Sequence, residues 1–125
     1  MASRLQTAGI PAAKADNYES DRGAQAYRDD HQSKLHRKWS DQVERRILTA
    51  MLDEVGPVDT LLDVPCGHGR LYDLFASRAR EVVAGDWSPS MLRTNRNDHD
   101  AAAKGYVRCS ALQLPVANDA ADVGV

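Results

Sequence analysis

Residues 60–69 have the sequence TLLDVPCGHG, in which a short apolar run gives way to a turn with two glycines. The run at 60–64 predicts a strand that is buried on both faces, as in parallel sheets. After the turn, apolar residues recur at helical spacing, at Leu71, Leu74, Phe75 and Ala79. A strand that passes through a glycine turn into a helix is the first unit of a parallel α/β sheet.

The same alternation continues downstream. Residues 81–86 predict a second buried strand, and Ser88-Pro89 predicts a helix start, with an N-cap serine followed by proline. Residues 106–110 predict a third strand, and residues 122–125 the start of a fourth. With right-handed crossovers, this order predicts a Rossmann-like α/β fold with helices on both faces of the sheet.

Upstream of this unit we expect a disordered N-terminus at residues 1–17 and a helical segment at residues 18–57. Asp41 and Glu44 have the spacing of a capping box, which predicts a helix start there. Gly56-Pro57 predicts the end of that helix. One apolar face is predicted for it, formed by Val43, Ile47, Met51, Leu52 and Val55. Residues 58–125 then form the α/β domain.

Composition excludes several classes of protein. The chain has 125 residues, enough for one small domain, and a formal net charge of −2, so nucleic acid is not the expected partner. Its two cysteines, Cys66 and Cys109, lie outside any metal-ligand spacing, so we expect no metal site and a reducing, cytoplasmic location. No apolar run is long enough for a membrane span.

The glycine turn is the first candidate binding feature. Gly67 and Gly69 have no Cβ, so a ligand can approach the bare backbone, and the amides that open the following helix can face an anion. A tight strand-to-helix turn without a ligand explains this glycine pair equally well.

Polar or aromatic residues also follow the second and third predicted strands. Asp86 is placed to accept two hydrogen bonds from a ribose diol, and Trp87 to lie along an adenine ring. Helix capping by Asp86 and core packing by Trp87 are the alternatives. After the third strand, Ser110 can meet an adenine edge, although an ordinary strand-to-loop transition explains it as well.

Three segments together resemble a known family. LLDVPCGHGRL, VVAGDWSPSML and CSALQLPVANDAADVGV are similar, in order and spacing, to the cofactor motifs of class I S-adenosylmethionine (SAM) dependent methyltransferases over residues 60–125. The pattern is most similar to the methyltransferase type 11, or ubiquinone-biosynthesis-like, group of small-molecule enzymes. The resemblance implies a class I methyltransferase sheet that is truncated here after the start of strand 4.

The resemblance also implies S-adenosyl-L-methionine as the cofactor. Its methionine part would lie against the backbone of Pro65, Cys66, Gly67 and Gly69, with Asp63 orienting this loop toward the cofactor's ammonium group. Asp86 would hold the ribose and Trp87 would flank the adenine, while Ser110 and Ala111 would lie at the adenine edge. The family's usual acid at position 110 is replaced by serine, which accepts a hydrogen bond without charge.

NAD is the main alternative cofactor for a glycine turn followed by an acid. The dinucleotide pattern needs a third glycine, and Tyr72 occupies that position. SAM is therefore favoured.

These residues predict a SAM-dependent methyltransferase that acts on a small-molecule methyl acceptor. No catalytic base is assigned, because a solvent-facing loop position explains His68 better than a catalytic role does, and the resemblance puts the acceptor pocket in a missing C-terminal half. The alternative is a non-catalytic SAM-binding module or a degenerate methyltransferase fragment. An unpaired apolar edge strand would favour self-association.

Overall fold

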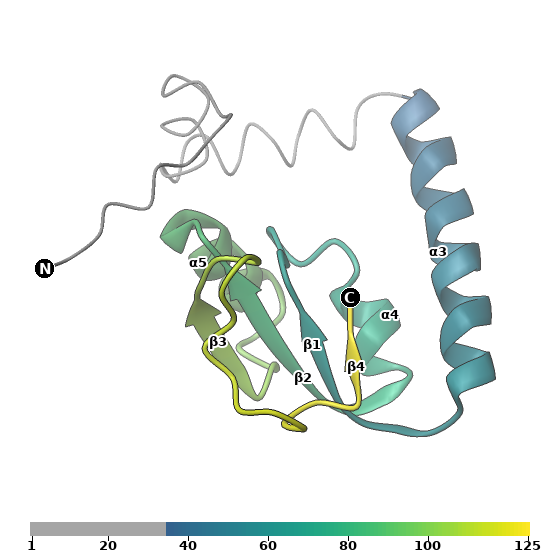
Figure 1. The fold of residues 1–125 in the computed structure, drawn as a ribbon. Coiled ribbons are helices and arrows are strands. Elements are labelled where there is room, and N and C mark those ends of the chain that lie inside the picture. Colours follow the sequence, from purple (N-terminus) through teal and green to yellow (C-terminus); the bar gives the residue numbers. More distant parts are fainter. Residues whose placement is uncertain (1–34) are drawn as a thin grey trace, which may run out of the picture.

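The computed structural model describes residues 35–125 of the chain. Its elements are α3 (Leu35–Val55), β1 (Val58–Asp63), α4 (Tyr72–Ala76), β2 (Ala79–Asp86), α5 (Pro89–Asp98), β3 (Gly105–Arg108) and β4 (Val123–Gly124). The strands form one sheet in the order β3-β2-β1-β4, and every neighbouring pair is parallel (Figure 1). The predicted parallel, Rossmann-like sheet with flanking helices is confirmed.

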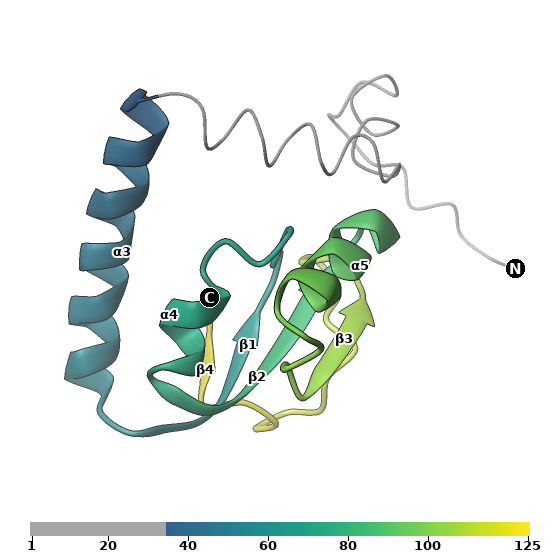
Figure 2. The same ribbon diagram turned by 180° about the vertical axis from the view of Figure 1, so that it is seen from behind.

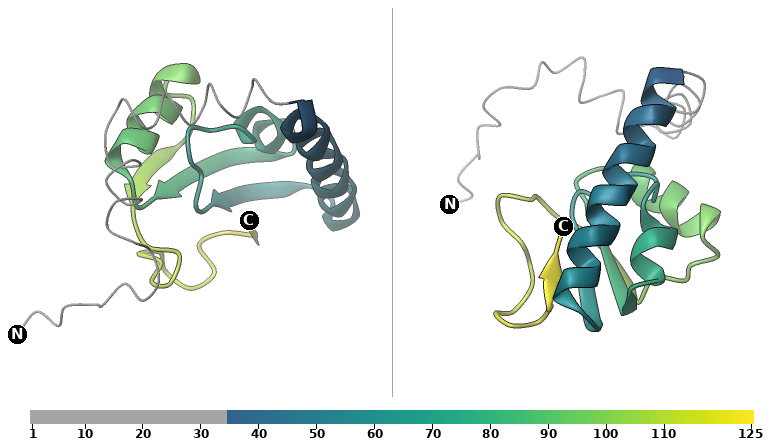
Figure 3. Two further views of the ribbon diagram at one scale, coloured as in Figure 1. Left: turned by 90° about the horizontal axis from the view of Figure 1, so that it is seen from above. Right: turned by 90° about the vertical axis from the view of Figure 1, so that its right-hand side faces the viewer.

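The strand order determines what lies on each face of the sheet. Each of the two crossovers, β1-α4-β2 and β2-α5-β3, moves the chain by one strand toward the same side of the sheet. Because both crossovers have the same handedness, α4 and α5 lie on the same face. The connection from β3 to β4 returns past β1 on the opposite face (Figure 3). α3 runs alongside α4 (Figure 2). Among residues 35–125, α4 and α5 therefore flank one face of the sheet, and the irregular connection from β3 to β4 crosses the other face.

The core lies between β1, β2 and α4. Leu61 of β1 and Phe75 of α4 are the largest apolar side chains with no exposed surface, and Val82 of β2 is 3% exposed. Each fully buried side chain of this kind stabilises the fold by about 1.5–3 kcal/mol. This packing holds β1 and β2 in place, and their carboxyl ends carry the candidate site.

Two predicted helix ends are confirmed. Gly56 follows α3 with φ of +84°, and its amide donates to the carbonyl of Leu52 at 3.1 Å. Ser88 caps α5, since its hydroxyl accepts a hydrogen bond from the amide of Met91 at 3.3 Å and Pro89 occupies the first turn.

The predicted start of α3 is wrong. Residues 35–40 are already helical, so Asp41 and Glu44 lie in the interior of the helix and are not a capping box. Both carboxylates instead form ion pairs with Arg70, across the gap between α3 and the glycine turn.

The predicted apolar face of α3 is also largely wrong. Only Leu52 is buried, whereas the side chains of Ile47, Met51 and Val55 are each more than half exposed. Helical spacing predicts which side chains share a face, but only tertiary packing decides whether that face is covered.

Smaller corrections concern the downstream elements. Ala79 opens β2 and is not part of the α4 stripe, and α4 is a helix of only five residues. β3 begins at Gly105 and ends at Arg108, so Ser110 lies beyond it, in an isolated bridge to Gln113.

The expected start of a fourth strand is present as β4. Val123 and Gly124 pair with Leu61 and Leu62 of β1. Just before β4, the Asp122 carboxylate accepts hydrogen bonds from the backbone amides of Asp59 and Thr60 at 3.1 and 2.9 Å. This side chain fixes the register of β4 on β1.

The predicted disordered segment 1–17, and the part of segment 18–57 before Leu35, lie outside the described residues. Of the helices between Leu35 and Val125, none combines the length and the apolar character that a membrane span requires.

Candidate cofactor site

The candidate residues converge on one edge of the sheet. Because the strands are parallel, β1, β2 and β3 all end on this edge, at Asp63, Asp86 and Arg108 (Figure 1). The turn at residues 64–71 and the start of α5 lie there too. Ligands of open α/β sheets bind at this edge.

The glycine turn has a backbone that only glycine fits easily. Gly67 and Gly69 have φ of +56° and +87°, and the Val64–Pro65 peptide is cis. A Cβ on Gly69 would lie 2.6 Å from Nε2 of His99, whereas one on Gly67 would meet nothing within 4 Å. Gly69 thus lets α5 pack against the turn, and Gly67 leaves open backbone beside which a ligand can lie.

Asp86 binds the turn to the second strand. Its Oδ2 accepts a hydrogen bond from the amide of Gly67, and its Oδ1 one from the amide of Ser88, both at 2.8 Å. Each carboxylate oxygen has a second lone pair that can accept from a hydroxyl group. Asp86 is therefore a structural residue of the turn as well as a candidate ribose ligand. The N-cap of α5 is Ser88, so the bond from the Ser88 amide to Asp86 is a turn contact and does not make Asp86 the cap.

Asp63 is a buried acid for which the described chain supplies no hydrogen-bond donor. Asp63 is only 6% exposed. Burial, reinforced by the negative charge of Asp86, raises the pKa of Asp63 to about 7, and Arg70 offsets only part of this rise. A carboxyl group in this state is stabilised by any cation that reaches it.

Asn95 of α5 also contacts the turn, and the sequence analysis assigned it no role in the site. The residue is fully buried, its Nδ2 donates to the carbonyl of Gly67 at 3.5 Å, and its Oδ1 has no partner. In the sequence, Asn95 is a polar residue at helical spacing from the apolar residues Met91 and Leu92, which places it on the buried face of α5.

Cys66 has no nucleophilic character in this environment. Burial, together with the charges of Asp63 and Asp86, raises the pKa of the Cys66 thiol above its usual value. Its amide donates to the carbonyl of Gly85 at 2.8 Å, so the residue joins the turn to β2. Cys66 therefore contributes backbone geometry to the site.

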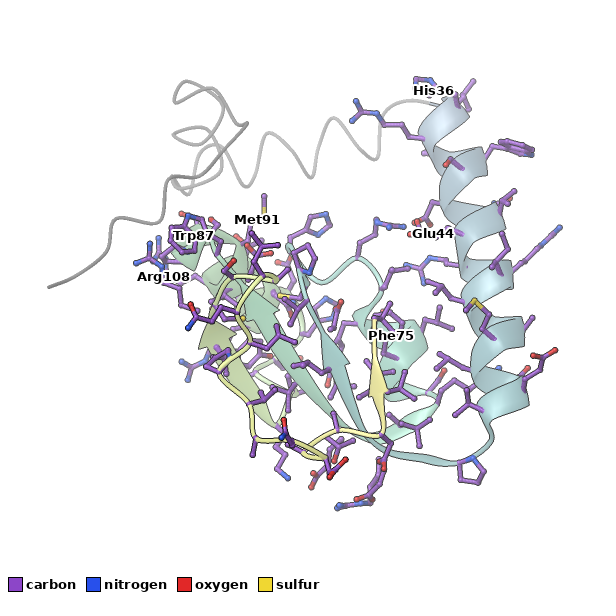
Figure 4. The ribbon with its side chains drawn as sticks, in the orientation of Figure 1. His36, Glu44, Phe75, Trp87, Met91 and Arg108 are labelled. Carbon is purple, nitrogen blue, oxygen red and sulfur yellow. The ribbon has the colours of Figure 1, made fainter. Side chains whose placement is uncertain are left out.

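Trp87 lies at the same edge, next to Arg108 (Figure 4). The indole is 54% exposed, and the Arg108 guanidinium lies 5.3 Å from the ring centroid. The Arg108 Nε also donates to the Trp87 carbonyl at 3.1 Å. The core-packing alternative for Trp87 is therefore wrong, and the ring is held at the surface by a cation–π contact.

Ser110 and Ala111 follow β3 at this edge. The Ser110 hydroxyl accepts a hydrogen bond from the amide of Leu112 at 3.1 Å, and Ala111 is exposed. A hydroxyl group can still donate its proton or accept a second bond, so Ser110 keeps the capacity to contact a ligand.

An ion-pair network joins the turn to α3. Arg70 pairs with Asp41 and, at 2.6 Å, with Glu44, and Arg45 pairs with Asp41 at 2.9 Å. The Arg45 guanidinium also donates to the carbonyl of Arg70. Burial alone would raise the pKa of Asp41, but its hydrogen bonds from Arg70 and Arg45 bring it below the usual value. Asp41 and Arg45 are one helical turn apart, but the contacts of both with Arg70 span 25 or more residues, so local sequence patterns do not predict this network.

Comparison with known proteins assigns the chain to a family. A family model described as "Methyltransferase domain" matches residues 61–125, which is more than half of the chain. The chain belongs to this methyltransferase domain family. The resemblance to class I methyltransferases is thereby confirmed, and it covers every strand except the start of β1.

Two solved structures are similar to this methyltransferase domain. Phosphoethanolamine N-methyltransferase 1 of Haemonchus contortus, solved with phosphoethanolamine and S-adenosylhomocysteine, is 20% identical with a TM-score of 0.48, over 55% of this chain and 15% of that one. A protein of Bacillus halodurans C-125, itself only provisionally described as a methyltransferase, is 28% identical with a TM-score of 0.44, over 54% of this chain and 32% of that one. The chain thus spans a third or less of these two proteins. No curated protein matches it significantly.

Proposed function

We propose that this chain is the cofactor-binding part of a SAM-dependent methyltransferase that acts on a small molecule. The observation that carries the proposal is Asp63, a buried acid at the carboxyl end of β1 with a pKa of about 7 and no donor among residues 35–125. An ammonium group bound there would satisfy this carboxylate. The amino acid part of SAM carries such a group.

The other residues of the edge fit the remaining parts of the cofactor. Gly67 offers open backbone, and the free lone pairs of Asp86 suit a ribose diol. The exposed ring of Trp87 suits one face of an adenine, with Ser110 and Ala111 at its edge. When bound, the cofactor supplies an electrophilic methyl group on a sulfonium.

The task of the protein in such a transfer is alignment. Holding the acceptor in line with the methyl group converts a bimolecular reaction into an effectively unimolecular one. The residues described here hold the donor side: Asp86 and Asn95 fix the turn, and Asp63 orients what binds on it.

Calorimetric titration with S-adenosylhomocysteine at pH 8 tests the proposal on the wild type, Asp63→Asn and Asp59→Asn. Asp59 is the matched control, because it lies on the same strand at the opposite edge of the sheet. We expect Asp63→Asn to weaken binding by about tenfold to a hundredfold, since losing a charged hydrogen bond costs about 1.5–3 kcal/mol. Asp59→Asn should leave the affinity unchanged within about twofold.

A folded wild type that binds no S-adenosylhomocysteine would contradict the cofactor assignment. Equal affinity of the wild type and Asp63→Asn would remove Asp63 from the site. Asp86→Ala is a poor probe, because the substitution also removes the acceptor for the amides of Gly67 and Ser88.

A further inference from the structure

A pocket of about 400 Å³ lies between α3, the glycine turn and the carboxyl end of α5. We call it the basic pocket, after the charged side chains that line it: Arg37, Lys38, Arg45 and Arg70, with Asp41 and Asp98. The sequence analysis did not predict it, because α3 and the turn are brought together only by the fold. In the cofactor site described above, Arg45 and Arg70 join the turn to α3, and none of the four cations is assigned to a group of the cofactor.

The balance of charge in the basic pocket is positive. Among residues 35–125, four cations and two acids line the pocket, and Glu44 adds a third acid through its ion pair with Arg70. These Lys, Arg, Asp and Glu side chains of the described residues sum to +1 (four minus three), whereas the whole chain carries −2. An anion is therefore attracted to this pocket over the surrounding surface.

The cations differ in how firmly they are held. Arg45 and Arg70 are fixed by Asp41 and by the Arg70 carbonyl, so their guanidinium groups are ordered before any ligand arrives. Lys38, in contrast, has no ion pair with any residue between Leu35 and Val125. An ordered guanidinium pair beside a free ammonium suits a carboxylate or phosphate, because each oxygen of the anion can accept more than one bond.

The basic pocket also adjoins the turn. His68 and Gly69 form part of its wall, and His68 is only 8% exposed, so the expectation of a solvent-facing His68 is wrong. His99, which follows α5, completes this side and contacts Tyr72 with ring centroids 4.7 Å apart and ring planes tilted by 41°. A group bound in the pocket would therefore touch the segment that carries the cofactor backbone contacts.

We propose that the basic pocket binds an anionic group, a carboxylate or a phosphate, through Lys38, Arg45 and Arg70. The identity of the molecule that carries this group rests on the proposed function. The group is either the carboxylate of the cofactor's amino acid part or an acidic group of the methyl acceptor. Both share the chemistry that the pocket recognises.

The test uses inorganic phosphate as the probe and the imidazole NMR signals of His68 and His99 as reporters, on the whole chain. The wild type is compared with Lys38→Gln and with Arg46→Gln, which removes the same charge from α3 outside the pocket lining. Phosphate should shift both imidazole signals in a saturable way. Its dissociation constant should rise at least about fivefold in Lys38→Gln and less than about twofold in Arg46→Gln.

Two further titrations identify the source. The first compares S-adenosylhomocysteine with 5′-methylthioadenosine, which lacks the amino acid part. If only S-adenosylhomocysteine abolishes the phosphate-induced shifts of the imidazole signals, the cofactor's carboxylate occupies the pocket. If phosphate binds equally to the protein saturated with S-adenosylhomocysteine, the pocket receives an acid of the acceptor. Either result supports an anion site.

The proposal is overturned if phosphate shifts neither imidazole, or if Lys38→Gln and Arg46→Gln weaken binding equally. Phosphate binding by a protein that binds no S-adenosylhomocysteine would contradict the proposed function and leave the anion site standing. The two failures are therefore distinguishable.

Discussion

The glycine turn and α3 lie side by side but are held in place by opposite kinds of interaction. The turn is fixed from three directions by buried polar contacts, through Asp86, Asn95 and the carbonyl of Gly85. α3 has one buried side chain, Leu52, and is joined to the turn by partly exposed ion pairs. Packed, buried contacts specify geometry to fractions of an ångström, whereas exposed ion pairs contribute little free energy and weaken in salt.

Because of this difference, we expect the glycine turn to be rigid and α3 to be able to shift. The turn can present its backbone to a ligand without rearrangement, because Gly69 packs closely against α5 and because Asp86 and Asn95 hold Gly67. α3 can shift at a smaller energetic cost, and it contributes half of the basic pocket.

Truncating one side chain in the core and one on α3 should give the largest difference in the free energy of unfolding. Phe75→Ala should destabilise the protein by about 3–5 kcal/mol, because the side chain has no exposed surface and its removal leaves a cavity. Ile47→Ala on α3 should stay within about 0.5 kcal/mol, since Ile47 is 54% exposed. Urea denaturation of both variants measures these differences, and a cost above about 2 kcal/mol for Ile47→Ala would show that α3 is packed after all.

Alanine substitution at two glycines makes a matched comparison. Both Gly69 and Gly56 have positive φ, but a Cβ on Gly69 would lie 2.6 Å from His99 and one on Gly56 would meet nothing within 4 Å. We expect Gly69→Ala to cost about 3 kcal/mol and Gly56→Ala about 1 kcal/mol, because only the first adds a clash to the backbone penalty. Equal costs in thermal unfolding would contradict the tight packing of α5 on the turn.

The buried carboxylate of Asp63 should reduce the stability of the protein at high pH. Because the folded-state pKa of Asp63 is about 7, above the value of 3.8 in an unfolded chain, the folded state holds the proton more tightly. Stability therefore falls as pH rises from about 4 to 7 and then levels off. At pH 8, Asp63→Asn should be more stable than the wild type by about 2–4 kcal/mol, while the two converge near pH 4. A pH-independent difference would place the cause outside the ionisation of Asp63.

Removing Arg70 from the network should have the smallest effect. We expect Arg70→Gln to destabilise the protein by about 1 kcal/mol at low salt, and by less in about 1 M NaCl, where partly exposed pairs are screened. Arg46→Gln controls for the lost charge. An effect that does not depend on salt would indicate that Arg70 acts through packing.

Local sequence signals predicted the turn region well. The apolar run that became β1, the glycines of the turn and the Ser88-Pro89 start of α5 are each specified by residues that are neighbours in sequence. The carboxyl ends of parallel strands necessarily share one edge, which is why Asp63 and Asp86 could be placed at one site.

Contacts across the fold could not be predicted in the same way. The exposure of Ile47 depends on what covers α3, and the partners of Asp41 and Glu44 depend on where Arg70 lies. The second role of Asp86, as acceptor for the Gly67 amide, also needs the distance between the turn and β2. Periodicity and spacing contain none of this information.

The affinity for S-adenosylhomocysteine as a function of pH tests the central claim most directly. If Asp63 receives an ammonium group, binding requires its ionised form and lowers its pKa, so the wild-type affinity should fall by up to about tenfold per pH unit below pH 7. The weaker binding of Asp63→Asn should vary little over the same range. A wild-type affinity that stays constant between pH 5.5 and 8, or the same pH profile in both proteins, would contradict the assignment of Asp63 to the cofactor.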